Sequence, residues 1–283
     1  MTQVRLGKTE IVTNKNGFGA LPIQRISFEE AEKLILTAYE NGITFFDTAR
    51  FYTDSEEKLG RALSSRGLRH KVFIASKTMC SNTDQFWSQL ETSLSNLKTD
   101  YLDLYQFHNP AVCPKPGDGS GLYEAMEEAK AQGKIRHIGF SFHDRAQLLD
   151  EILTAHPEVD FVQLQINYLD WENESIQSRR CYEVACRHNK PVIVMEPVKG
   201  GTLAHVPEGI RSLFSAARPD LSPPAWAIRF AASLDNVLVV LSGMSDLAQM
   251  EDNISFMEDF SPMTARERIV VERAAELLRK RKS

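Results

Sequence analysis

The stretch FFDTARFYTDSEEKLG, residues 45–60, changes from a buried strand to an amphipathic helix across a short connection. Its two leading phenylalanines favour a strand, and the residues from Ser55 onward have the polar and apolar spacing of a helix. Asp47 and Tyr52 stand on the connection between them. A strand that leads directly into a helix is the repeating unit of parallel α/β folds. The number of times this unit recurs therefore decides the fold class.

Short apolar runs with helical stretches between them recur eight times along the chain. Most of the runs are apolar throughout, which is typical of parallel strands buried on both faces. Eight such units in 283 residues predict an α/β protein with a closed (β/α)8 TIM barrel. An open, doubly wound sheet is the alternative, but it usually has fewer units. The expected strands are residues 16–22, 43–49, 72–77, 102–108, 135–141, 161–167, 192–197 and 237–243.

Two segments lie outside the eight units. Residues 4–15 predict a β-hairpin with a Gly-Lys turn before the first barrel strand, and residues 264–281 predict an additional amphipathic helix after the last unit. The chain shows no linker, low-complexity segment or change of composition. We therefore expect residues 1–283 to form a single barrel domain.

The composition is that of a soluble globular protein, with 42% hydrophobic and 25% charged residues. A net charge of −5 and a pI near 5.9 give no electrostatic footprint for nucleic acid or an anionic membrane. The first residues are polar, so no signal peptide is expected, and no apolar run approaches the ~20 residues of a membrane span. These features predict a cytoplasmic protein that acts on small molecules, as a monomer or a small homo-oligomer.

The four cysteines, Cys80, Cys113, Cys181 and Cys186, contain no C-x-x-C pair and are few for a disulfide scaffold. Cys181 and Cys186 lie five residues apart on a predicted helix, a spacing that suits neither a tetrahedral metal site nor a redox pair. We expect reduced, mostly buried thiols and no metal site.

Ionisable residues fall at the carboxyl ends of three consecutive predicted strands, where the functional sites of TIM barrels lie. Asp47 ends the second strand, Lys77 the third and His108 the fourth, and Tyr52 follows Asp47 closely. Taken singly, each could have a structural role, as a turn residue or a strand-end cation. Together they favour an active site at one rim of the barrel.

The four side chains suit a specific chemistry. Lys77 at the end of an apolar strand needs a counter-charge, and Asp47 is the obvious partner. A nearby ammonium is expected to lower the pKa of Tyr52 from its usual value of about 10, which makes the phenol a usable general acid. His108 can orient and polarise a carbonyl group. The set suits reduction of C=O, provided that something supplies hydride.

The sequence FDTARFYTDSEEKLG resembles the signature of the aldo-keto reductase family, and FIASK and DLYQFH resemble its lysine and histidine strands. The resemblance covers nearly the whole chain. It implies that Asp47, Tyr52, Lys77 and His108 are the catalytic tetrad and that a nicotinamide nucleotide donates the hydride.

The stretches VMEPVKGGTLA and WAIRFAASLDNVLVVLSGMSDLAQMEDN look most like one bacterial branch of this family. Members of that branch often continue into a ferredoxin-like iron–sulfur segment. The cysteines of such a segment are absent from this sequence, so no iron–sulfur cluster is expected.

The resemblance also implies which residues hold the nicotinamide. Ser141 and Gln165 match the residues that bind its carboxamide. Phe142 replaces an asparagine of many relatives, and His143 either supplies the missing contact or caps the helix that follows. Met195 stands where relatives often have an aromatic residue that stacks on the ring.

The resemblance places the phosphates and the adenosine farther along the chain. Lys199, Gly200 and Gly201 match the pyrophosphate-binding stretch, and Asn253 matches the residue that reads adenine. Gly243 and Gln249 replace two basic residues that often bind the 2′-phosphate, so NADP(H) and NAD(H) both remain open. The full expected cofactor set is Ser141, His143, Gln165, Met195, Pro197, Lys199, Gly200, Gly201, Gly243, Met244, Ser245, Gln249 and Asn253.

The expected function is NAD(P)-dependent reduction of an aldehyde or ketone, sugars and sugar derivatives included, or the reverse oxidation of an alcohol. Tyr52 would act as the general acid or base. One alternative is a nucleotide-binding redox sensor or regulatory subunit with little turnover, and another is an aldolase-like barrel with Lys77 as a Schiff-base amine. The candidate substrate contacts are Gln24, Arg25, Asn109, Tyr168 and Trp171.

Overall fold

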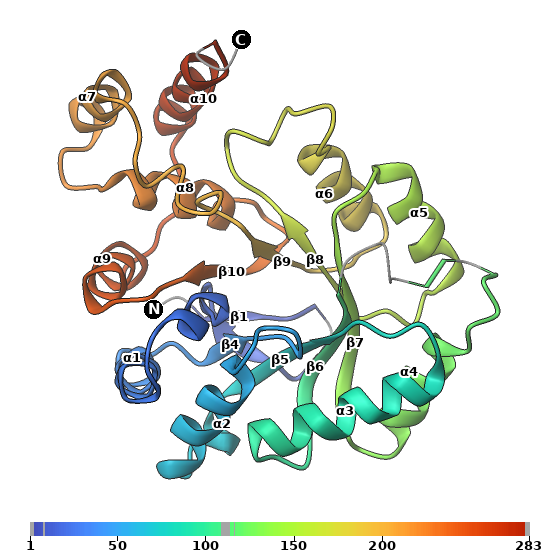
Figure 1. The fold of residues 1–283 in the computed structure, drawn as a ribbon. Helices are drawn as coiled ribbons and strands as arrows, with labels where there is room; N and C mark the ends of the chain where they lie inside the picture. The colour runs from blue at the N-terminus through green and yellow to red at the C-terminus, as the bar shows by residue number, and fades with distance from the viewer. Residues whose placement is uncertain (1–2, 8, 109–113, 116, 281–283) are drawn as a thin grey trace.

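The computed structural model describes residues 3–7, 9–108, 114–115 and 117–280. In this part of the chain eight parallel strands close a barrel in the order β3–β4–β5–β6–β7–β8–β9–β10 (Figure 1), which confirms the predicted fold class. Pairing of β10 with β3, with Val240 opposite Asn16, closes the ring. The barrel strands are β3 (Asn16–Gly19), β4 (Phe45–Asp47), β5 (Phe73–Thr78), β6 (Leu102–Phe107), β7 (Ile135–Phe142), β8 (Phe161–Gln165), β9 (Val192–Met195) and β10 (Val237–Gly243).

Helices surround the barrel, and α7, α8, α9 and α10 gather on the side of β9 and β10 (Figure 1). The helices are α1 (Phe28–Glu40), α2 (Ser55–Ser65), α3 (Thr83–Leu97), α4 (Leu122–Ala131), α5 (Ala146–Ala155), α6 (Ser178–Arg187), α7 (Glu208–Ala217), α8 (Pro223–Ala232), α9 (Leu247–Met257) and α10 (Ala265–Lys280). Two short 3-10 helices are η1 (Leu21–Arg25) and η2 (Arg69–Lys71).

Local sequence signals explain where these helices begin. Ser27 caps α1, because its side chain accepts a hydrogen bond from the Glu30 backbone N–H while the Glu30 carboxylate accepts one from the Ser27 N–H. Ser222 caps α8 with a single hydrogen bond, which its side chain accepts from the Ala225 N–H, and Pro223 occupies the first turn, where no N–H is required. The apolar faces of both helices then pack on the barrel.

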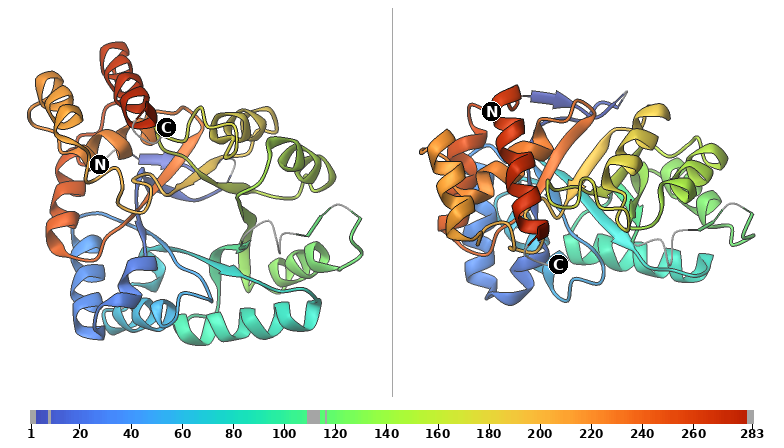
Figure 2. Two further views of the ribbon diagram at one scale, coloured as in Figure 1. Left: turned by 45° about the horizontal axis from the view of Figure 1, so that its top comes forward. Right: turned by 90° about the horizontal axis from the view of Figure 1, so that it is seen from above.

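The N-terminal hairpin closes one end of the barrel. Its strands are β1 (Gln3–Arg5) and β2 (Val12–Asn14). Leu6 and Ile11 are fully buried in one hydrophobic cluster with Phe45 and Phe161, the first residues of β4 and β8. The hairpin therefore covers the amino ends of the strands, and the right-hand view of Figure 2 shows it at the end opposite the face seen in Figure 1. The carboxyl ends of the strands stay accessible.

The structure departs from the sequence pattern in two places. Residues 21–25 form η1 instead of extending the first strand, because Pro22 lacks the N–H that a strand ladder requires. Helix α7 is an additional element that the eight-unit pattern does not predict. It packs against α8 and α10 in a hydrophobic cluster of its own, in which the Phe214 ring stacks on Trp226 at 4.8 Å.

Among the described residues, Cys80 and Cys181 are buried free thiols and Cys186 is a partly buried one, whereas Cys113 lies outside the described residues. No helix in the described ranges is long and apolar enough to cross a membrane. Nor do His, Cys, Asp and Glu side chains in these ranges gather in threes as metal ligands would.

Two helical glycines allow a matched test of packing. A Cβ at Gly60 in α2 would lie 2.3 Å from the Asn96 carbonyl oxygen and 2.6 Å from the Leu97 Cα, whereas a Cβ at Gly209 in α7 would meet nothing within 4 Å. We expect Gly60→Ala to lower the free energy of unfolding by about 1–3 kcal/mol, because the backbone of α3 must move. Gly209→Ala should leave it unchanged or raise it by up to about 1 kcal/mol. Urea unfolding measures both, and equal effects would contradict the close contact of α2 with α3.

Candidate active site

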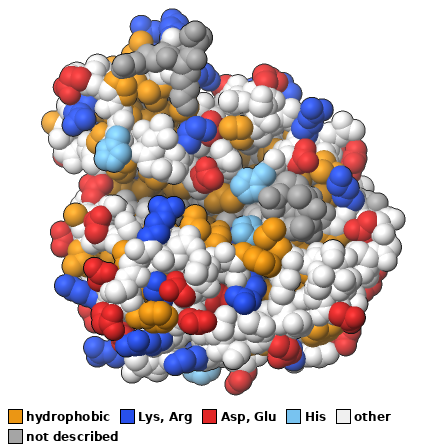
Figure 3. Space-filling view, viewed as in Figure 1, with side chains coloured by type: hydrophobic (Ala, Val, Ile, Leu, Met, Phe, Trp, Pro, Cys, Tyr) orange, Lys and Arg blue, Asp and Glu red, His pale blue; other side chains and the backbone are white. Residues whose placement is uncertain are grey.

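A cavity of about 820 Å³ opens at the carboxyl end of the barrel. Figure 3, viewed from the side shown in Figure 1, shows this face hollowed, with histidine and hydrophobic side chains around the hollow. Every barrel strand contributes a lining residue at its carboxyl end or directly after it: Gly19, Asp47, Lys77, His108, Ser141, Gln163, Met195 and Ser242. The cavity volume lies in the range of small-molecule and cofactor sites.

Asp47 and Lys77 form an ion pair on the floor of this cavity. Lys77 Nζ lies 2.5 Å from Asp47 Oδ2, and the two side chains are 1% and 5% exposed. The pairing of β4 with β5 sets Asp47 opposite Ala75, and Lys77 lies two residues farther on the same face of its strand. Lys77 also donates to the Thr48 carbonyl oxygen at 2.8 Å, and Gln106 Nε2 donates to the second Asp47 oxygen at 3.2 Å.

The ion pair determines the charge of the lysine. Burial disfavours the ammonium form, but the carboxylate of Asp47 and the phenol of Tyr52 outweigh it, so the pKa of Lys77 is raised above its usual value. Lys77 is therefore a protonated, fixed cation at neutral pH.

Tyr52 lies against this cation. The connection that carries it is a tight turn, in which the Tyr52 N–H donates to the Ala49 carbonyl oxygen at 3.0 Å. Lys77 Nζ lies 5.3 Å from the centre of the Tyr52 ring, and the His108 ring meets the Tyr52 ring edge-on at 5.6 Å. A cation, a phenol and an imidazole thus share one small volume.

The expected lowering of the Tyr52 pKa is wrong in this structure. Burial raises the pKa of the Tyr52 phenol, and although the Lys77 ammonium opposes this, the carboxylate of Asp47 adds to it. The phenol is therefore protonated throughout the neutral range. Lys77 still favours the phenolate that proton donation would leave behind.

His108 is neutral. Burial, together with the nearby charge of Lys77 and with His143, lowers the pKa of His108 to about 3. Its Nδ1 is buried and has no hydrogen-bond partner among the described residues. A neutral imidazole carries one N–H and can donate it to a ligand oxygen.

The structure brings most of the expected cofactor residues to the same cavity. Those that line it are Ser141, His143, Met195, Pro197, Gly200, Gly201, Gly243, Ser245, Gln249 and Asn253. The Asn253 side chain is fixed by a hydrogen bond that its Nδ2 donates to Ser242 Oγ at 2.6 Å. Their binding roles stay predictions, but their convergence does not depend on the resemblance.

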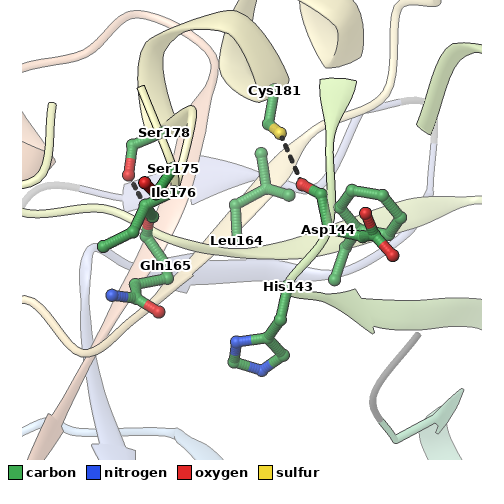
Figure 4. Close-up of a pocket in the computed structure, with 9 residues that line it drawn as sticks. His143, Asp144, Leu164, Gln165, Ser175, Ile176, Ser178 and Cys181 are labelled. Atoms are coloured by element: carbon green, nitrogen blue, oxygen red, sulfur yellow. Dashed lines mark hydrogen bonds between the residues drawn. The ribbon is translucent and has the colours of Figure 1, made fainter. Parts of the chain in front are cut away.

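Three expected cofactor residues do not line the cavity. Lys199 forms an ion pair with Asp170, with Nζ at 2.6 Å from each carboxylate oxygen. Met244 is fully buried in the core. Gln165 borders a smaller cavity of about 80 Å³ next to the main one (Figure 4), and His143 lines both.

The structure excludes one of the two interpretations of His143, and the other, a contact to the cofactor, stays a prediction. Helix α5 begins at Ala146 without a side-chain cap, and the Ala146 N–H donates to Gln177 instead, so the capping interpretation is wrong. Strand alternation explains the outcome, because Phe142 points outward into the hydrophobic core while Ser141 and His143 border the cavity. Burial lowers the pKa of His143, which is therefore a second neutral imidazole at this site.

Of the expected substrate residues that the structure describes, only Arg25 lines the cavity. Gln24 instead accepts a hydrogen bond from Thr53 Oγ1 at 3.0 Å. Tyr168 is 3% exposed and Trp171 is partly buried, and both pack edge-on against Phe230 outside the cavity lining. Asn109 lies outside the described residues.

Several lining residues were not singled out from the sequence, among them Gln163, Glu196 and His205. Gln163 could have been found by alternation, since it lies two residues before Gln165 on the same strand. Glu196 lies directly after β9 and before Pro197, and its φ is 53°. The residue before a proline usually has an extended conformation, so the local sequence does not predict this positive φ.

Comparisons with known proteins identify a matching family model and several similar proteins. The model of the aldo/keto reductase family matches residues 15–268. An aldo-keto reductase of Mycobacterium avium is 31% identical over 224 residues, which cover 77% of this chain and 73% of that protein. Methylglyoxal reductase DkgA of Yersinia pestis is 31% identical over 245 residues, or 84% of this chain and 82% of that protein. A solved aldo-keto reductase of Klebsiella pneumoniae in complex with NADPH has a TM-score of 0.80 at 22% identity. The match covers 96% of this chain and 94% of that protein.

The ion pair on the cavity floor predicts a non-additive effect on stability. We expect Lys77→Met to lower the free energy of unfolding by about 3–5 kcal/mol, because it leaves Asp47 buried without its partner. The double substitution Asp47→Asn with Lys77→Met removes both charges and should lose less than Lys77→Met alone. Urea unfolding at neutral pH measures the parent, Lys77→Met, Asp47→Asn and the double variant, which together complete a double-mutant cycle. Losses that simply add would mean that the two charges are not coupled in the folded state.

Proposed function

This chain belongs to the aldo/keto reductase family, and we propose that it reduces an aldehyde or ketone to the alcohol, or catalyses the reverse reaction, with a nicotinamide nucleotide. The observation that carries the proposal is the buried Asp47–Lys77 pair with Tyr52 and His108 directly against it on the cavity floor. The carbonyl-reducing relative named above, methylglyoxal reductase, supports the reaction class.

The cavity suits a nicotinamide nucleotide in its size and in its lining. Ser141, Met195 and Asn253 line it together with the tetrad, and Asn253 comes from helix α9. Gly200 and Gly201 have positive φ angles and open space where a Cβ would stand, so their backbone can approach a ligand closely. The NADPH of the Klebsiella relative makes NADPH the first nucleotide to test, with NADH beside it.

Each member of the tetrad has a distinct role in this proposal. Neutral His108 donates an N–H to the carbonyl oxygen and so orients and polarises the substrate. The reduced nicotinamide, when bound, supplies the hydride that forms the new C–H bond. Tyr52 gives its phenolic proton to the carbonyl oxygen, which completes the alcohol. The Lys77 ammonium stabilises the phenolate until solvent returns a proton, and Asp47 keeps Lys77 in place and charged.

The same geometry disfavours the aldolase alternative. A Schiff base requires an unprotonated amine that can reach the substrate. Lys77 has a raised pKa, a carboxylate at 2.5 Å and 1% exposure of its side chain. No feature of the described residues favours a pure nucleotide sensor over an enzyme, since all four catalytic side chains meet at the cavity floor.

The proposal predicts that Tyr52→Phe abolishes turnover but keeps nucleotide binding. A positioned general acid contributes about 10²- to 10⁴-fold, so we expect kcat for a panel of simple aldehydes to fall by roughly that factor. The Kd for NADPH or NADH, from fluorescence quenching, should stay within about threefold, because the aromatic ring remains. The readout is the loss of absorbance of the reduced nicotinamide.

Two results would contradict this mechanism. Undiminished turnover in Tyr52→Phe would remove the proton donor. Trapping of a carbonyl substrate on Lys77 by borohydride, detected by mass spectrometry of the tryptic peptide, would instead establish the Schiff-base alternative.

A further inference from the structure

A second ion pair, between a buried carboxylate and a partly exposed lysine, lies beside the cavity and has no role in the chemistry above. Asp170, in the connection after β8, is 2% exposed. Its partner Lys199 comes from the turn after β9 and lies 2.6 Å from both carboxylate oxygens. The charge of Asp170 is therefore fully compensated inside the protein.

Asp170 also accepts hydrogen bonds from two side-chain amides of its own segment. Gln165 Nε2 donates to Asp170 Oδ2 at 3.0 Å, and Asn167 Nδ2 donates to the same oxygen at 2.9 Å. The Asp170 N–H in turn donates to Asn167 Oδ1 at 2.9 Å. Asn167 thus fixes Asp170, and Asp170 fixes the amide of Gln165.

The bond from Gln165 determines which way its amide faces. A glutamine side chain has donors on one atom and an acceptor on the other, so committing the nitrogen to Asp170 turns the oxygen the opposite way. Figure 4 shows the Gln165 oxygen on the side of His143 and its nitrogen on the far side. Burial lowers the pKa of His143, and a hydrogen bond with Gln165 opposes this by raising it. An upward effect is expected when the Gln165 oxygen, an acceptor, faces the imidazole.

The turn that carries Lys199 does not depend on the ion pair for its shape. The Lys199 N–H donates to the Glu196 carbonyl oxygen at 3.0 Å, and the Leu203 and Gly201 N–H groups each donate to the Val198 carbonyl oxygen at 3.1 Å. The lysine side chain can therefore be replaced while the turn keeps its own hydrogen bonds. A substitution of Lys199 therefore tests the role of its charge without removing the hydrogen bonds that shape the turn.

We propose that Asp170 is a positioning residue for nucleotide binding: it holds the Gln165 amide with its oxygen toward His143 and the nicotinamide end of the cavity. In that orientation Gln165 accepts a hydrogen bond from the amide nitrogen of the bound nicotinamide. Lys199 neutralises Asp170 and does not bind phosphate. The inference rests on the proposed function, because it takes a nicotinamide nucleotide as the ligand.

Single substitutions in this network would leave a buried charge without a partner, so charge-neutral pairs provide the test. Asp170→Asn with Lys199→Met keeps an oxygen at residue 170 that can accept from Gln165. Asp170→Leu with Lys199→Met has the same net charge and a side chain of similar size but no acceptor. Thermal unfolding shows whether the two double variants are equally folded.

The Kd values for NADPH and NADH, from fluorescence quenching, then measure the role of the acceptor. We expect the Asn/Met protein to bind within about threefold of the parent and the Leu/Met protein to bind at least tenfold more weakly, a loss of about 1.4 kcal/mol. With Gln165→Ala as the starting protein, Asp170→Leu with Lys199→Met should change the Kd by less than about threefold, because the amide that it orients is gone.

The outcomes separate this inference from the function on which it rests. If the parent binds neither NADPH nor NADH, the proposed function fails. If the parent binds and the two double variants lose affinity equally, the orientation of Gln165 by Asp170 is refuted. A tenfold loss that persists in the Gln165→Ala protein refutes it as well, because Asp170 would then act without Gln165.

Discussion

The buried pair of Asp47 and Lys77 is the interaction on which the rest of the site depends. Two opposite charges with 1% and 5% exposed side chains are stable only if each has the other close by and further polar partners around it. Thr48, directly after β4, and Gln106 in β6 provide those partners. The pair therefore ties together the ends of three neighbouring strands and fixes a positive charge below the cavity.

Burial and that fixed charge together determine the protonation of the neighbouring side chains. His108, buried and close to the Lys77 ammonium, remains neutral, with its pKa lowered to about 3. Burial keeps the Tyr52 phenol protonated. The Tyr52 ring contacts both the Lys77 ammonium and the neutral imidazole of His108. The two ends of the barrel also differ in polarity. Leu6 and Ile11 seal the amino end with apolar contacts, while the polar groups collect at the carboxyl end.

The sequence predicted those features that follow from local periodicity. Uniformly apolar runs predicted the parallel strands, and the place of Asp47, Lys77 and His108 at strand ends predicted their convergence, because parallel strands bring their carboxyl ends to one rim. Partner choice could not be predicted in this way. Lys199 was expected at phosphate, yet it pairs with Asp170, 29 residues away in the chain. Tyr168 was expected at substrate, yet it packs against Phe230. The direction of the Tyr52 pKa also needed the structure, because burial and the lysine charge act in opposite directions.

The pH dependence of kcat/KM for carbonyl reduction tests most directly whether Tyr52, held against Lys77, is the proton donor. This parameter reports the pKa values of the free enzyme. Because the Tyr52 pKa is raised, the phenol keeps its proton through neutral pH. We predict that kcat/KM stays level as pH rises through neutrality and falls only above the ordinary range of tyrosine, near pH 10. A fall with rising pH near 6.5, the ordinary pKa of histidine, would contradict this account, because the donor would then be an imidazolium.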